Sequence, residues 1–140
     1  MTKSQDFENA IKTAIDAATN KNMIWGKDDC SLWVCDVILA AKGVDLAKPL
    51  RGKYQTRTEA YRVMKDFAGG DLIDAAIKLA AEANLISTFW PWKGILVGIV
   101  ASATGRPSLA LFWKGRWVAR SETGVLWLPA SAGVAAWRMA

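Results

Sequence analysis

Histidine is absent from the 140 residues of the chain. The imidazole group suits general acid–base catalysis near neutral pH, and it is also a common zinc ligand. Its absence excludes a histidine general base supplied by this chain, and it leaves only two cysteines for a zinc site, which is a poor set of ligands. We therefore expect no metal and no cofactor.

Cysteine is nearly as scarce, occurring only as Cys30 and Cys35. The two residues are expected on one helix, where a separation of five residues places the Cα atoms about 8–9 Å apart. That distance exceeds the reach of a disulfide bond. We expect no disulfide within the chain.

Long apolar runs are also missing. The longest strongly apolar uncharged segment, 94–105, is too short to cross a bilayer as a helix, and the segment 123–137 is interrupted by Pro129 and Gly133. The first residues, MTKSQDFEN, are polar and include acids, unlike a signal peptide. These features predict a soluble protein that is synthesised in a cytoplasm and does not insert into a membrane.

Tryptophan, in contrast, is abundant. The eight residues are Trp25, Trp33, Trp90, Trp92, Trp113, Trp117, Trp127 and Trp137. A small domain rarely needs eight indole rings for packing alone, and indoles are enriched at the centres of protein interfaces. Some of them are therefore expected at a docking surface, and Trp113 and Trp117, which flank a predicted hairpin turn, are the candidates.

Positive charge is concentrated in residues 48–65. This basic window contains six Lys or Arg residues and one Glu, a net charge of +5, which equals the net charge of the whole chain. It could contact nucleic acid, an anionic wall polymer or an acidic protein partner, or it could be a solvated helix face with a basic loop. Arg51, Lys53 and Arg57 are the candidate partner-binding cations, and nucleic acid is the less favoured partner.

Apolar residues recur at helical spacing four times in the first part of the chain. Asp28 or Asp29 can cap the second of these helices, and Gly43 can end it. Thr56 and Glu59 form a capping-box pattern before the third.

After residue 84 the apolar segments become short and are separated by Gly or Pro, as is typical of strands. The predicted strands are 95–101, 109–113, 117–120, 125–128 and 135–139, the last completing the sheet, and Lys114-Gly115 fits a tight hairpin turn. Helices followed by strands predict one α+β domain over residues 1–140, helical over 1–84 with an antiparallel sheet over 85–140.

Cys30 follows two aspartates at the start of the second predicted helix. A helix N-terminus lowers the pKa of a thiol through the helix dipole and the free backbone N–H groups, which is one way to activate a nucleophile. Cys30 also begins an apolar stripe, and burial in apolar surroundings makes a thiol inert. Both interpretations are open at this point.

The segment Trp25-Gly26-x-x-Asp29-Cys30-Ser31 resembles the nucleophile segment of NlpC-type cell-wall peptidases, papain-like bacterial and phage enzymes that cleave peptide bonds in peptidoglycan stems. The chain is more similar to a related phage and prophage family. Further segments that carry this resemblance are Gly43-Val44-Asp45, Arg51-Gly52-Lys53-Tyr54, Gly69-Gly70 and Ala136-Trp137-Arg138. The resemblance runs from residue 25 to residue 138 and implies a papain-like, NlpC-like domain of the kind encoded among phage tail-assembly genes.

The chain departs from the enzymes at the catalytic positions. In NlpC-type peptidases a histidine that opens a strand is the general base, and a polar residue on the next strand orients it. The resemblance places Ser108 at the first position and Arg120 near the second. Serine cannot accept a thiol proton near neutral pH, arginine remains protonated, and the charges of Asp28 and Asp29 oppose formation of a thiolate. Only Cys30 of the expected triad is present.

Three functions are consistent with these observations. The first is a degenerate cysteine-peptidase fold that serves as a structural or docking protein of a phage tail, at the tail tip or in tail assembly, with other tail proteins as partners and the virion as its location. The second is an active peptidoglycan-cleaving peptidase in which Cys30 works with an unrecognised base. The third is a nucleic-acid-binding module that uses the basic window. The missing base favours the first.

Overall fold

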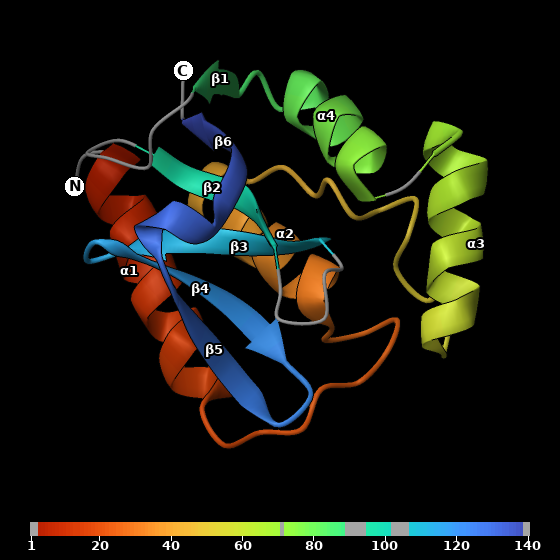
Figure 1. Cartoon of the computed structure of the whole chain (residues 1–140), viewed down its shortest axis with the longest axis horizontal. Helices are drawn as coiled ribbons and strands as arrows, with labels where there is room; N and C mark the ends of the chain where they lie inside the picture. Colours follow the sequence, from red (N-terminus) through yellow and green to blue (C-terminus); the bar gives the residue numbers. More distant parts are fainter. Residues whose placement is uncertain (1–2, 71, 89–94, 102–106, 139–140) are drawn as a thin grey trace.

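The computed structural model describes residues 3–70, 72–88, 95–101 and 107–138 of the chain. Within these residues four helices are followed by an antiparallel sheet of six strands in the order β1-β6-β2-β3-β4-β5 (Figure 1). The elements are α1 (Lys3–Ala18), α2 (Cys30–Lys42), α3 (Arg57–Ala68), α4 (Leu72–Glu82), β1 (Ile86–Thr88), β2 (Ile95–Ala101), β3 (Pro107–Trp113), β4 (Arg116–Ser121), β5 (Gly124–Pro129), the short 3-10 helix η1 (Ala130–Ala132) and β6 (Gly133–Arg138). The predicted α+β class with an antiparallel sheet is confirmed.

Helix α2 packs against both α1 and the sheet, and most of its residues are buried. It begins after Asp29, whose carboxylate accepts hydrogen bonds from the first free N–H groups of the helix. It ends at Gly43, which adopts the left-handed conformation (φ 73°) and donates its N–H to the carbonyl of Leu39 at 2.8 Å. The indole of Trp33 donates to the carbonyl of Ala14 at 3.3 Å and thereby joins α2 to α1.

Helix α3 is more exposed and packs mainly against α4 at the side of the molecule (Figure 1). The predicted N-cap at Thr56 is confirmed, because Glu59 donates its N–H to the Thr56 hydroxyl. The Glu59 carboxylate accepts a hydrogen bond from the same hydroxyl, whereas a full capping box would use the Thr56 N–H. Only Ala60 and Met64 of α3 are buried. The helix therefore presents most of its basic surface to solvent.

The hairpin between β3 and β4 turns at Lys114 and Gly115, as predicted. Both residues have positive φ, 50° and 81°, which matches a two-residue turn that follows the twist of the strands. The prediction for the last strand was incomplete. Strand β6 lies inside the sheet because β1, a strand of three residues that the apolar pattern did not reveal, pairs with its outer edge.

Trp117 does not lie at a docking surface, and the prediction that it does was wrong. Its side chain is 0% exposed on the sheet face opposite the main core, where Phe112 packs edge-to-face against it. Its indole N–H donates to the carbonyl of Ala130 in η1 at 3.1 Å. A Cβ atom built at Gly98 or Gly133 would overlap the indole ring, so two glycines make room for it.

The other tryptophans that the structure describes are also packed. Trp33 and Trp137 are buried, and Trp25, Trp113 and Trp127 are half-buried against the main core. Trp90 and Trp92 lie outside the described residues. More of the tryptophans within the described residues therefore pack in the interior than the sequence analysis predicted.

Replacing Trp117 by alanine should destabilise the fold by about 3–5 kcal/mol, because a fully buried indole and its hydrogen bond are lost. The matched control is Leu126→Ala on the neighbouring strand, where the side chain is 43% exposed and the expected loss is below about 1 kcal/mol. Urea unfolding measures both variants, and equal losses would contradict the burial of Trp117.

Candidate functional site

The carboxylate of Asp29 organises the chain around Cys30. Asp29 is 0% exposed. One of its oxygens accepts the N–H groups of Ser31 and Leu32 at 3.0 and 2.9 Å, and these bonds cap α2. The other accepts the N–H of Gly26 at 3.0 Å and the hydroxyl of Tyr54 at 2.6 Å. Four donors from three segments therefore meet at one buried charge.

Gly26 and Tyr54 can approach Asp29 only because residue 26 is a glycine. Gly26 has a φ of 82°, and a Cβ atom there would overlap the carbonyl oxygen of Tyr54. The carbonyl of Gly26 also accepts the N–H of Gly52 at 3.1 Å. The Trp25-Gly26 and Gly52-Lys53-Tyr54 segments, which are separate in sequence, form one folded unit with the start of α2.

Burial and the hydrogen bond to Asp29 raise the pKa of the Tyr54 hydroxyl. The hydroxyl therefore remains a donor to Asp29 throughout the physiological pH range.

Cys30 is the first residue of α2 and is half-buried, as expected for the start of this helix. Burial raises the pKa of its thiol above the ordinary value of 9.0, and the negative charge of Asp29 raises it further. Hydrogen bonding at Ser31 and at the Cys30 backbone lowers the pKa of the thiol, but by less than burial and Asp29 raise it. The thiol is protonated near neutral pH.

Cys30 lines a pocket of about 460 Å³, called here the Cys30 pocket. Its other lining residues are Met23, Trp25, Arg57, Tyr61, Pro107, Ser108, Arg120, Ser121 and Glu122. Cys30, Ser108 and Arg120, to which the resemblance assigned the positions of the nucleophile, the base and the orienting residue, therefore line the same pocket. They come from the start of α2, the start of β3 and the end of β4.

Neither Ser108 nor Arg120 is arranged to accept a proton from Cys30. The Ser108 hydroxyl donates to the carbonyl of Leu109 at 3.2 Å. The Arg120 side chain is 0% exposed; it pairs with Asp28 at 3.1 Å and donates to the carbonyls of Ser121 and Gly124. Arg120 thus holds the loop before α2 against the β4–β5 turn, a contact between residues 92 positions apart in the chain.

The three predicted partner-binding cations have different surroundings. Arg51 forms ion pairs with Asp36 and Asp45, so its charge is already balanced within the chain. Lys53 is exposed on the loop before α3. Arg57 lines the Cys30 pocket, pairs with Glu122 at 3.0 Å and lies 5.8 Å from the centre of the Trp25 ring. Of the three, only Arg57 belongs to the pocket.

Sequence reasoning did not identify Tyr54 and Glu122 as site residues. Tyr54 was visible as the end of the Arg51-Gly52-Lys53-Tyr54 segment, but nothing in the sequence indicated that its hydroxyl reaches Asp29. Glu122 lies in a short turn and meets Arg57 only through the fold. Neither contact has a local sequence signal.

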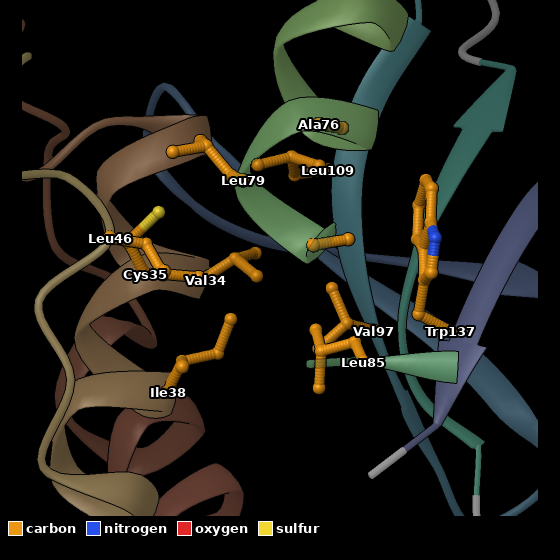
Figure 2. A pocket seen from close by; sticks show the side chains of 11 residues that line it. Val34, Cys35, Ile38, Leu46, Ala76, Leu79, Leu85, Val97, Leu109 and Trp137 are labelled. Carbon is orange, nitrogen blue, oxygen red and sulfur yellow. The ribbon is translucent and has the colours of Figure 1, made fainter. Parts of the chain in front are cut away.

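Cys35 lies on the opposite side of α2 from the site, in the main core. It faces an apolar cavity of about 20 Å³, with Val34 and Ile38 of α2 beside it and Trp137 of β6 across the space (Figure 2). Burial raises the pKa of its thiol to about 12. The cavity has room for little more than one water molecule, and its lining is apolar, so it is a packing defect and not a ligand site.

Two further observations concern the described residues only. No group of three or more His, Cys, Asp or Glu side chains among them is arranged to hold a metal ion. No helix among them has the length and apolar character required to cross a membrane.

The sequence of this chain matches one family, described as "Domain of unknown function (DUF6950)", over residues 2–139. The chain belongs to this family. The match covers nearly the whole chain, so the helices, the sheet and the Cys30 pocket all lie within the family domain. No curated protein and no solved structure matches the chain.

The hydrogen bond between Tyr54 and Asp29 should contribute measurably to stability. We expect Tyr54→Phe to cost about 1.5–3 kcal/mol, because a buried carboxylate loses one of its donors. Asp29→Ala should cost more, and the double variant should cost less than the sum of the two. Chemical denaturation of the four proteins measures this coupling. Asp16→Ala, at an exposed site on α1, is the control, and additive losses would contradict the shared network.

The two thiols should react slowly and in a fixed order. We expect iodoacetamide to modify Cys30, measured in a Cys35→Ala variant, more slowly than a free cysteine near neutral pH, with the rate rising at alkaline pH. Cys35, measured in a Cys30→Ala variant, should react more slowly still, because its thiol is more deeply buried. Rapid modification of Cys30 near neutral pH would show that its thiol is a thiolate and would contradict the raised pKa.

Proposed function

We propose that this protein is a degenerate, papain-like and NlpC-like module that has lost peptidase activity and serves as a structural or docking protein of a phage tail. One observation carries the proposal: Cys30, Ser108 and Arg120 line one pocket, yet none of them supplies a general base. The arrangement supports a peptidase-type site that retains a cysteine at the nucleophile position but lacks the general base that catalysis needs.

The missing base has a large effect on rate. General acid–base assistance contributes about 10²–10⁴-fold to catalysis, and a cysteine peptidase needs it both to form the thiolate and to protonate the leaving amine. Burial and Asp29 already disfavour the Cys30 thiolate. The Arg120 side chain is held by Asp28 and by the carbonyls of Ser121 and Gly124, so its role in the lining of the Cys30 pocket is structural.

The docking role is supported by the charge on the surface. Lys48, Lys53, Arg57, Arg62 and Lys65 of the basic window are exposed. Arg51 is the exception because it is engaged by two aspartates. Such a surface favours association with an acidic protein surface and increases the rate of encounter. The resemblance to proteins encoded among phage tail-assembly genes makes other tail proteins the proposed partners and the virion the proposed location.

The proposed function predicts no release of stem-peptide fragments when the purified protein is incubated with peptidoglycan. It also predicts that the protein is recovered with tail proteins from infected cells, in the particle or in a tail intermediate. Mass spectrometry of the digest and of the purified particles makes both measurements. Fragments that disappear in Cys30→Ala would establish the active peptidase instead, and absence from every tail fraction would contradict the docking role.

A further inference from the structure

We propose that the Cys30 pocket binds an acidic polypeptide segment of a partner protein, whose carboxylate replaces Glu122 on Arg57. This inference rests on the proposed docking function and assigns that function a site and a ligand chemistry. Glu122 would then act as an internal substitute for the carboxylate of the partner.

The size and lining of the pocket suit a peptide. Its volume of about 460 Å³ lies within the range of small-ligand sites and exceeds the space that a single carboxylate group needs. Trp25, Tyr61, Met23 and Pro107 supply aromatic and apolar surface, against which neighbouring side chains of an extended segment can pack.

Arg57 is the cation that such a segment can reach. Its side chain is 50% exposed, and its partner Glu122 is 71% exposed. An ion pair between exposed groups contributes only about 0–1 kcal/mol, so a carboxylate on a ligand can displace Glu122 at little cost. Arg57 also lies over the Trp25 ring, which holds the guanidinium group beside the aromatic wall.

Arg120, the other cation in the pocket lining, is already held by the protein. Arg120 is 4% exposed and lines the pocket. Among the described residues, its buried Nε–H has no hydrogen-bond partner. The two Nη atoms are engaged by Asp28, Ser121 and Gly124. Since Asp28 balances the charge of Arg120 and the Arg120 side chain is 0% exposed, a segment in the pocket reaches the guanidinium group of Arg57 and not that of Arg120.

Charge complementarity favours an acidic segment over other partners. Lys53, Arg57, Arg62 and Lys65 are exposed on α3 and on the loop that leads to it, where the exposed acids are Glu59 and Asp66, so this surface has a net positive charge. Nucleic acid needs a row of cations that follows successive phosphates, whereas the lining of this pocket contains one exposed cation. A single carboxylate flanked by apolar side chains matches that lining better.

The test compares two synthetic probes, acetyl-Gly-Phe-Glu-Phe-Gly-amide and the same peptide with Gln in place of Glu. Binding is followed by NMR through the indole N–H signal of Trp25. We expect saturable binding in which the Glu peptide binds at least threefold more tightly than the Gln peptide. Glu122→Gln should tighten binding of the Glu peptide by about two- to fivefold, because the internal competitor is removed.

Arg57→Gln should abolish the preference for the Glu peptide, whereas Arg62→Gln, which removes an exposed charge from the same helix outside the pocket, should leave it unchanged. Equal binding of the two peptides, no binding of either, or equal effects of the two arginine variants would overturn the inference. Mass spectrometry of the recovered peptide distinguishes a failure of the proposed function from a failure of the proposed peptide binding. Cleavage that depends on Cys30 would contradict the proposed function, whereas an intact peptide that does not bind contradicts only this inference.

Discussion

The buried carboxylate of Asp29 is the interaction on which the site depends. It caps α2, holds the turn at Gly26 and anchors the Tyr54 loop, so three segments of the chain take their positions from one charge. Burying a carboxylate is costly unless hydrogen bonds compensate it, and four donors do so here. The same charge lies next to Cys30 and raises the pKa of the thiol. The carboxylate that caps the start of α2 therefore adds to the effect of burial, which is the larger cause of the raised Cys30 pKa.

The parts of the fold that could be predicted from the sequence are those with local signals. A cap at Asp29, a cap at Thr56 and a turn at Lys114 each depend on residues within a few positions of one another. The alternation of short apolar segments with Gly and Pro likewise predicted β2 to β5 within two residues at each end. Cys30, Ser108 and Arg120, the positions that the resemblance compared with a catalytic triad, line one pocket.

The rest depends on contacts between distant residues, which composition cannot reveal. Trp117 is buried because η1 folds over it, and glycines on two strands leave space for its ring. Arg51 lies in a basic window, but its partners Asp36 and Asp45 are on α2 and on the loop that follows it. The abundance of tryptophan and the net positive charge therefore led to a prediction of more free docking surface than the structure has.

We propose that residue 108 lies where a base would act on Cys30, whose thiol pKa is raised by burial and by the charge of Asp29. The most direct measurement is the pKa of Cys30 in a Ser108→His variant, read from the ultraviolet absorbance of the thiolate in a Cys35→Ala background. An imidazole at that position should form an ion pair with the thiolate and lower the pKa of Cys30 well below its value in the parent protein. Ser87→His, on exposed β1, should leave it unchanged. An unaltered Cys30 pKa in Ser108→His would show that the two positions do not face each other and would contradict the account.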